Sequence, residues 1–207
     1  MKITEIFYSI QGEGKQMGLP TIFVRAAGCN LKCDWCDTKY AWKGGKETTI
    51  EEITDAVHDF PSKRVCLTGG EPLVHDEIYE LIDALIDEYE LTVETNGSLD
   101  ISKLTKMDLM ISMDYKTPSS LMAGKMKEKN LGLLRERDQL KFVIDDRKDY
   151  EYSKEVINDQ PIKSEIIFQP MGGKKLKRLV EWVLEDDLDV RVLPQLHKII
   201  WGDKKGV

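Results

Sequence analysis

The sequence predicts an α/β fold whose parallel sheet forms an incomplete, open barrel of the (β/α)6 type, with short modifications at both termini. Short β-branched and aromatic runs alternate with amphipathic helical segments, an order typical of parallel strands joined by right-handed crossovers. About six such strands in 207 residues fall short of the eight strands and roughly 250 residues of a closed barrel. No repeat or Pro-rich linker divides the chain, so residues 1–207 are expected to form a single domain.

The first half of the chain carries the clearest patterns. Residues 21–25 are β-branched and aromatic, which predicts a strand that leads into a Cys-rich loop. Thr49 and Glu52 form a capping-box pattern, and apolar residues at helical spacing extend the predicted helix to Phe60. The next predicted strand covers 64–68. An amphipathic helix follows over 76–90, and it leads into a predicted strand at 91–95.

The second half is less regular. Further strands are predicted at 108–113, 139–144, 165–169 and 190–193. Helical spacing predicts helices over 152–159 and 174–185. The stretch between the strands at 108–113 and 139–144 contains Pro118, Gly124 and Gly132 and shows no clear helical pattern.

Composition excludes several classes of partner. The net charge is −7, so nucleic-acid binding is not expected, and the basic run at 174–178 is predicted to be a solvated helix face. No apolar stretch approaches 18 residues, and the first ten residues lack the pattern of a signal peptide. Three of the four Cys are crowded together without export signals, which points to metal chemistry in a reducing cytoplasm.

The crowded Cys are Cys29, Cys33 and Cys36, on a loop after the strand at 21–25. A [4Fe–4S] cluster usually has four thiolate ligands, so three would leave one iron free for another ligand. A three-thiolate zinc site completed by a distant His remains an alternative at this point; the candidates are His58, His75 and His197. Cys66 lies within the strand at 64–68 and is predicted to pack as a small hydrophobe.

Unusual residues follow the predicted strands where ligands bind in parallel α/β sheets, at the carboxyl ends. The strand at 64–68 ends in Thr-Gly-Gly-Glu-Pro, where paired glycines allow close backbone approach to a ligand. Glu94, near the end of the next strand, is expected to face a cavity. Two more strand ends carry Asp-Tyr-Lys at 114–116 and Gln-Pro-Met at 169–171. Together these segments predict one shared rim.

Five motifs resemble those of the 7-carboxy-7-deazaguanine synthases, a family of the radical S-adenosylmethionine (SAM) superfamily. They are Ser-Ile-Gln-Gly-Glu-Gly at 9–14, the segment Arg-x-x-Gly-Cys-Asn-Leu-x-Cys-x-Trp-Cys-Asp-Thr at 25–38, Thr-Gly-Gly-Glu-Pro at 68–72, Glu-Thr-Asn-Gly at 94–97 and Gln-x-His-Lys at 195–198. The resemblance implies the radical SAM core fold, a [4Fe–4S] cluster, SAM and Mg²⁺. It implies conversion of 6-carboxy-5,6,7,8-tetrahydropterin to 7-carboxy-7-deazaguanine with loss of ammonia, on the route to queuosine and archaeosine. It also implies a homodimer and an external one-electron reductant of the flavodoxin or ferredoxin type.

The resemblance further assigns roles to residues, with the radical supplied by the cofactor and no catalytic side chain. Cys29, Cys33 and Cys36 would hold the cluster, and Thr38 would be the Mg²⁺ ligand. The SAM side would comprise Trp35, Asp37, Gly70, Glu71, Asp114, Tyr115, Lys116, Gln169, Pro170 and Met171. The substrate side would comprise Ile10, Gln11, Gly12, Glu13, Arg25, Thr68 and His197. Judged without the resemblance, the Thr38 hydroxyl is expected to make a local backbone bond.

Two other functions compete with this interpretation. A glycyl-radical activase is similarly compact and carries a Gly-rich turn before its cluster loop, but the complete motif at 9–14 and the Gln-x-His-Lys run argue against it. A non-catalytic zinc adaptor is the second alternative, and it predicts a colourless protein without iron. The sequence leaves open whether the tail that ends at Val207 reaches the substrate.

Overall fold

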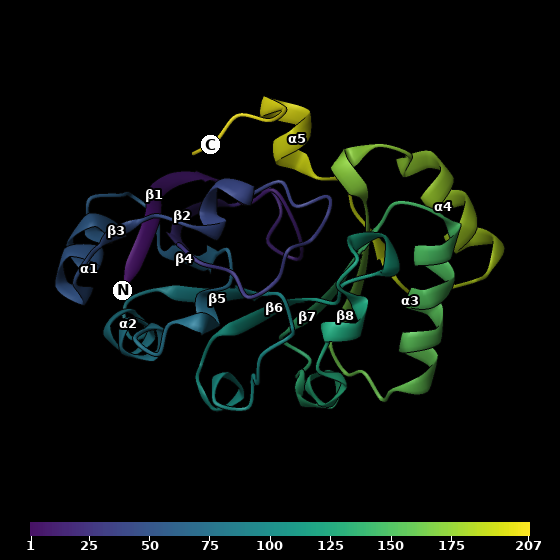
Figure 1. Ribbon diagram of the computed structural model, residues 1–207, viewed down its shortest axis with the longest axis horizontal. Helices are drawn as coiled ribbons and strands as arrows, with labels where there is room; N and C mark the ends of the chain where they lie inside the picture. The colour runs from purple at the N-terminus through teal and green to yellow at the C-terminus, as the bar shows by residue number, and fades with distance from the viewer.

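A single nine-stranded sheet organises the computed structural model, which describes residues 1–207 (Figure 1). The strand order is β3-β1-β2-β4-β5-β6-β7-β8-β9, and the sheet does not close. Its strands are β1 (Lys2–Ile10), β2 (Pro20–Ala26), β3 (Lys46–Glu47), β4 (Arg64–Gly69), β5 (Glu90–Thr95), β6 (Met110–Asp114), β7 (Gln139–Ile144), β8 (Glu165–Pro170) and β9 (Arg191–Val192). All neighbours from β2 to β9 are parallel, whereas β1 is antiparallel to β2 and β3. The predicted α/β class and open sheet are confirmed.

The antiparallel strands β1 and β3 are the part of the sheet that the sequence analysis missed. Most residues of β1 are only partly buried, so the strand lacks the clear alternation of apolar and polar residues that marks a half-buried strand. A register shift between Ile3 and Glu5 interrupts its pairing with β2. Two residues of β3 pair with Lys2 and Ile3, too short a run to give a pattern.

The α-helices are α1 (Ile50–His58), α2 (Ile78–Leu85), α3 (Arg147–Asp159), α4 (Leu176–Glu185) and α5 (Leu196–Trp201). The capping box of Thr49 and Glu52 is confirmed at the start of α1. Helix α3 begins five residues earlier than predicted because the Asp146 side chain accepts a hydrogen bond from the Asp149 N–H and caps it. The connections from β5 to β6 and from β6 to β7 contain only 3₁₀ turns, so two crossovers lack an α-helix.

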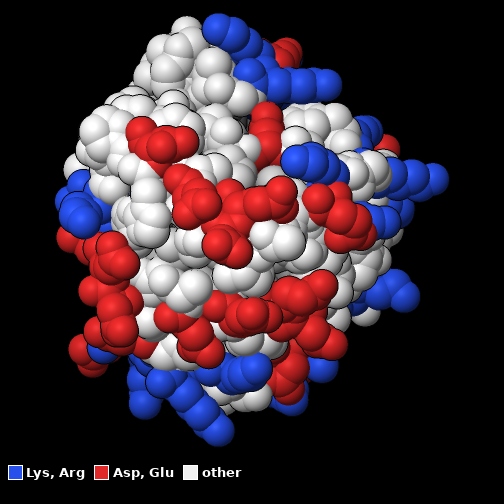
Figure 2. Space-filling model, turned by 90° about the vertical axis from the view of Figure 1, so that its left-hand side faces the viewer, with Lys and Arg blue, Asp and Glu red and all other residues white.

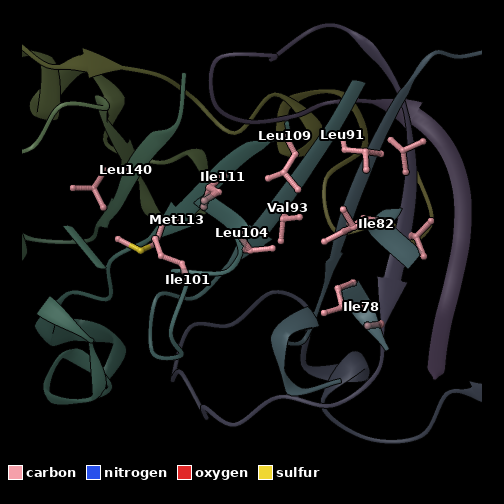
Figure 3. Close-up of a cluster of buried hydrophobic side chains, with 14 of the residues drawn as sticks. Ile78, Ile82, Leu91, Val93, Ile101, Leu104, Leu109, Ile111, Met113 and Leu140 are labelled. Carbon is pink, nitrogen blue, oxygen red and sulfur yellow. The ribbon is translucent and has the colours of Figure 1, made fainter. Parts of the chain in front are cut away.

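Each parallel strand turns alternate side chains to opposite faces of the sheet. One face packs under the helices and 3₁₀ turns; Figure 3 shows Leu91 and Val93 of β5 beside Ile111 and Met113 of β6, with Ile78 and Ile82 of α2. These side chains belong to one cluster of 31 buried apolar residues. The intervening residues face the other side, and they are mostly polar. The polar face therefore carries the chemistry, and the apolar face holds the fold together.

The outer surface is unevenly charged. Acidic side chains gather on the face formed by α1 and α2, which Figure 2 views directly. Both helices contribute to this concentration, with Glu51, Glu52 and Asp55 in α1 and Glu80 and Asp83 in α2. None of the helices combines the length and the apolar character needed to cross a membrane.

Candidate active site

A cavity of about 600 Å³ opens on the polar face of the sheet. Side chains from β1, β2, β4, β5, β6 and β7 line it at or near the carboxyl ends of the parallel strands. Helix α5 and the C-terminal tail cross above β1 and complete its wall (Figure 1). The predicted common rim is therefore present, and it encloses a volume of the size that ligand-binding cavities have.

The Cys loop lies against the end of β4. The Glu71 N–H donates a hydrogen bond to the Gly28 carbonyl oxygen at 2.8 Å, and the Gly70 N–H donates one to the Ala26 oxygen at 3.1 Å. A Cβ at Gly70 would lie 2.2 Å from the Gly28 oxygen and 2.9 Å from the Cys29 Cβ, so only glycine permits this approach. Cys33 and Cys36 line the cavity, and Cys29 sits beside Gly70 at its margin.

The three thiols have the chemistry of cluster ligands, because all three are free and lie on one loop. No three His, Cys, Asp or Glu side chains come together as ligands of one metal ion would. Zinc would need each sulfur about 2.3 Å from the metal, whereas thiolates of a [4Fe–4S] cluster bind separate irons and stand further apart. The three His residues have other contacts, with Glu88 for His58, with the Ala27 carbonyl oxygen for His75 and with Asp37 for His197. The donor set of three free thiols thus fits the implied cluster, and each of the three His residues contacts another group.

Glu71 differs from its predicted place on the SAM side. Its side chain is fully buried and does not line the cavity. The carboxylate accepts hydrogen bonds from the Thr95 hydroxyl at 2.8 Å, the Asn96 N–H at 2.6 Å and the Leu73 N–H at 3.1 Å. The backbone turn after Gly70 directs the side chain behind the cavity wall, where it ties the end of β4 to the end of β5.

Replacing Glu71 with alanine is expected to lower the free energy of unfolding by about 3 kcal/mol, because three buried donors lose their acceptor. Burial raises the pKa of the Glu71 carboxyl to about 7, from an ordinary value of 4.5. The folded chain therefore holds this proton more tightly than the unfolded chain does, so stability falls as pH rises from about 4.5 to about 7. Urea unfolding across this range measures both effects.

In Glu71→Ala, the contribution of Glu71 to the pH dependence of stability is expected to disappear, and the free energy of unfolding is lower throughout. Glu80→Ala, at an exposed position on α2, is the matched control and should change neither quantity. A Glu71→Ala protein as stable as the unaltered chain would contradict the tie between β4 and β5.

The other residues predicted for SAM divide into two groups. Trp35, Asp37, Gly70, Asp114, Lys116 and Met171 line the cavity, whereas Tyr115, Gln169 and Pro170 do not. The Tyr115 ring turns to the apolar face and lies 5.7 Å from the Phe142 ring. Gln169 is fully buried, and its Nε2 donates a hydrogen bond to the Pro194 carbonyl oxygen at 3.2 Å. Strand alternation and the chain after β9 therefore remove these three side chains from the cavity.

All seven residues predicted for the substrate side line the cavity, namely Ile10, Gln11, Gly12, Glu13, Arg25, Thr68 and His197. Gly12 and His197 pack closely, because a Cβ at Gly12 would lie 2.3 Å from the His197 Nδ1. The Leu196 N–H donates a hydrogen bond to the Gly12 carbonyl oxygen at 2.9 Å, which joins α5 to the turn after β1. The two ends of the chain meet at this point.

Arg25 presents the free part of its guanidinium to the cavity. Its Nε donates a hydrogen bond to Glu5 Oε1 at 2.7 Å, and the Tyr40 hydroxyl donates one to the same oxygen at 2.6 Å. The two terminal nitrogens of Arg25 have no hydrogen-bond partner within the protein. Burial, together with the neighbouring Glu5 carboxylate, raises the pKa of Tyr40 to about 12, so its hydroxyl stays protonated. An anionic ligand can therefore take the open edge of the guanidinium.

Three further polar residues line the cavity without having been assigned a role. Glu94 accepts hydrogen bonds from Gln11 Nε2 at 3.2 Å and from the Thr68 hydroxyl at 3.0 Å. Gln195 donates from Nε2 to Glu13 Oε1 at 2.8 Å, while its buried Oε1 has no partner. Lys141, in the middle of β7, contacts Glu13 and Asp114. For Lys141, the available signal in the sequence was a charged residue within a strand that is otherwise apolar enough to be buried.

The C-terminal tail forms the remaining wall. All of residues 202–207 line the cavity, including Val207. The Lys205 ammonium lies 4.4 Å from the centre of the Tyr40 ring. Cys66 lies outside the wall and is fully buried, with Gln11 Nε2 at 3.8 Å from its sulfur. Its predicted burial is confirmed, but it lies on the polar face of the sheet and not in the main apolar cluster.

The chain is similar to several known proteins. Residues 23–158 match the Radical SAM superfamily. The chain is 41% identical over 209 residues to the 7-carboxy-7-deazaguanine synthase of Thermoplasma acidophilum, and 38% identical over 227 residues to that of Koribacter versatilis, with all of both chains covered in each case. The crystal structure of QueE from Escherichia coli is similar in fold, with a TM-score of 0.75 and 23% identity over 93% of each chain.

Proposed function

The chain belongs to the 7-carboxy-7-deazaguanine synthase family of the radical SAM superfamily, and from that premise we propose how its residues divide the work of the reaction. It is a radical SAM lyase of 7-deazapurine biosynthesis. The substrate is 6-carboxy-5,6,7,8-tetrahydropterin, and the products are 7-carboxy-7-deazaguanine and ammonia. When bound, the cluster and SAM supply a 5′-deoxyadenosyl radical that takes a hydrogen atom from C6 of the pterin, after which the ring contracts.

Cys29, Cys33 and Cys36 would hold the cluster, and three protein ligands would leave one iron free to bind SAM. On the SAM side, Trp35 presents an aromatic face and is fixed by its indole N–H, which donates to the Ser119 hydroxyl oxygen at 2.9 Å. The Lys116 ammonium donates to Asp114 Oδ2 at 2.8 Å and lies 5.6 Å from the centre of the Trp35 ring. These three side chains form a charged and aromatic shelf that positions SAM beside the Cys loop.

On the substrate side, the free edge of Arg25 pairs with the pterin carboxylate, which matches a guanidinium fork. Glu13 accepts hydrogen bonds from the N–H groups of the pterin ring. The unpaired Oε1 of Gln195 is a second acceptor for the same edge, because a buried acceptor without a donor is costly until a ligand supplies one. Glu94 holds Gln11 and Thr68 in place through its two oxygens.

The observation that carries the proposal is that the seven substrate-side residues line the same cavity as Cys33 and Cys36. The test is anaerobic reconstitution followed by incubation with SAM, Mg²⁺, a reductant and the carboxytetrahydropterin, with products identified by mass spectrometry. We expect 7-carboxy-7-deazaguanine and one equivalent of ammonia. Formation of 5′-deoxyadenosine alone, over repeated trials, would reject the substrate assignment while leaving the superfamily assignment in place.

Thr38 is proposed as the protein ligand of Mg²⁺. Thr38 lines the cavity, and its hydroxyl donates a hydrogen bond to Asp37 Oδ1 at 2.8 Å and makes no capping bond to the following 3₁₀ turn. A single protein oxygen beside substrate oxygens and water suits an ion that keeps several of its waters. The expected local backbone bond of Thr38 is therefore not what the structure shows.

Replacing Thr38 with valine removes this oxygen and keeps the shape of the side chain. The Mg²⁺ concentration needed for half-maximal activity is expected to rise about tenfold or more, the loss typical of a weakened metal site. Titration of Mg²⁺ against product formation measures it. Thr48→Val, at a partly buried Thr outside the cavity whose hydroxyl donates to the Lys46 carbonyl oxygen, is the matched control. An unchanged Mg²⁺ requirement in Thr38→Val would remove Thr38 from the metal site.

The partners and the setting follow from the same site. Cys29 and Cys36 are partly exposed, so an external one-electron carrier can approach the edge of the cluster. We place the reaction in the cytoplasm, because free cluster thiols require a reducing compartment. A homodimer is proposed, and the exposed apolar side chains of Tyr8, Leu19, Ile199 and Ile200 are available to an interface. Sedimentation equilibrium measures the mass.

The remaining architectural proposals are that residues 1–207 fold as one domain and that the curved sheet acts as an incomplete (β/α)6 barrel around the radical. One continuous sheet and one apolar cluster support a single domain. The lining of the cavity by six consecutive neighbours in the sheet supports the barrel-like arrangement.

A further inference from the structure

Lys141 is the most deeply enclosed cation of the cavity. It occupies the third position of β7, a strand in which every residue is buried, and only 6% of its side chain is exposed. Its neighbours Leu140 and Phe142 point to the apolar cluster, so alternation directs Lys141 to the cavity. A buried ammonium is costly unless it is paired. The position therefore needs a function that a hydrophobic residue could not fulfil.

Two carboxylates share this ammonium. Lys141 Nζ lies 3.1 Å from Asp114 Oδ1 and forms a second ion pair with Glu13 Oε2. Asp114 comes from the neighbouring strand β6, in register with Lys141, whereas Glu13 comes from the turn after β1. Because both oxygens contact one nitrogen, they lie within about 6 Å of each other. Without the cation, these two negative charges would repel each other in a poorly solvated site.

Each carboxylate also has a partner on its own side of the cavity. Glu13 Oε1 accepts a hydrogen bond from Gln195 at 2.8 Å, and Asp114 Oδ2 accepts one from Lys116 at 2.8 Å. The result is one continuous chain of polar contacts from Gln195 through Glu13, Lys141 and Asp114 to Lys116. Under the proposed function, its first half faces the pterin and its second half faces SAM.

We propose that Lys141 is a positioning residue that couples the two ligands, so that binding of the pterin strengthens binding of SAM and the reverse. The inference rests on the proposed function, which assigns the pterin to Glu13 and SAM to Asp114. When N–H groups of the ligand donate to Glu13, the interaction between Glu13 and the Lys141 ammonium weakens. Lys141 then interacts more strongly with Asp114 and keeps that carboxylate ionised and ordered. Linkage requires the same factor in both directions.

The test measures binding without turnover. Anaerobically reconstituted protein without reductant is titrated with SAM, alone and with saturating pterin, by calorimetry. The coupling factor is the ratio of the two dissociation constants, and for the unaltered chain we expect about tenfold tighter SAM binding with pterin, within the usual range of such couplings. In Lys141→Met the ratio is expected to fall to about one, whereas Lys141→Arg, which keeps the charge, retains part of it.

A residue with a merely structural role would weaken both ligands and leave the ratio unchanged, so the ratio separates the two explanations. Lys177→Met makes the same replacement on α4, where the side chain is 91% exposed, and should behave as the unaltered chain does. Iron content and thermal unfolding establish that each variant is folded and loaded. If Lys141→Met does not fold, Lys141→Gln, which keeps an amide donor but no charge, is expected to show the same loss of coupling.

Two results would overturn the inference alone, namely an unaltered chain that makes the deazaguanine but binds SAM equally with and without pterin, or uncharged variants that keep the full ratio. An unaltered chain that makes no deazaguanine when a reductant is added overturns the proposed function, and the inference with it.

Discussion

Replacing Cys33 with serine is expected to abolish SAM cleavage, with product formation at least about 10⁴-fold below that of the unaltered chain. Cys33 is one of only three thiols on the loop, and a serine hydroxyl is a poor substitute for a thiolate on iron. Because Cys33 sits on a loop and not in the sheet, the fold should survive. Iron analysis, the visible absorption of the cluster and the yield of 5′-deoxyadenosine measure the loss, and far-ultraviolet circular dichroism measures the fold.

Cys66 provides the matched control, because it is also a free thiol but lies inside β4 and does not line the cavity. Cys66→Ala should load iron and cleave SAM. If Cys33→Ser kept about four irons per chain and cleaved SAM, the cluster would have to be held elsewhere, and the assignment of the whole loop would fail.

Replacing Arg25 with lysine is expected to reduce kcat/KM for the pterin by about 100- to 1000-fold, the range for loss of one partner in a buried charge pair. Lysine keeps the charge but cannot offer two parallel N–H groups to a carboxylate, and its ammonium would be drawn to Glu5, the present partner of the guanidinium. SAM cleavage should continue, so 5′-deoxyadenosine should accumulate without a matching amount of deazaguanine. Quantifying both products in one assay gives this ratio.

Arg64→Lys is the control for Arg25→Lys, since Arg64 lies at the other end of a parallel strand and pairs with Glu90 at the surface. It should leave kcat/KM unchanged. A pterin kcat/KM in Arg25→Lys within a few-fold of the unaltered chain would show that the substrate carboxylate binds elsewhere.

The sequence predicted most of the fold because the parallel strands are buried and the helices amphipathic, so their local patterns match their environments. The capping box at Thr49 is an example in which two residues, Thr49 and Glu52, determine a helix boundary. Strand β1 was missed because its partial exposure blurs the alternation on which prediction depends. The sequence indicated only one of the two crossovers that lack an α-helix. Pro118 and Gly124 weaken the helical pattern between β6 and β7, but they do not affect the connection between β5 and β6.

For the site, residue type was easier to predict than direction. The paired glycines were predicted to allow close backbone approach to a ligand, and in the structure they lie where β4 meets the Cys loop. Nothing local shows that the Glu71 carboxylate turns away from the cavity. All seven substrate-side residues were proposed from the resemblance, and the close packing of Gly12 and His197 depends on the meeting of the two ends of the chain. Lys141 was missed because its partner Glu13 lies 128 residues away, a contact that only the completed sheet creates.

The cavity wall formed by residues 202–207 has a practical consequence for handling the protein. An affinity tag fused after Val207 would add chain to a segment that borders the cavity, and a protease that trims the last few residues would open that wall while leaving the sheet intact. Met1 also makes a specific contact, because its amino group donates a hydrogen bond to the Thr48 carbonyl oxygen at 3.0 Å. Preparations that differ only in tag position or in C-terminal trimming should therefore be treated as different enzymes until their activities have been compared.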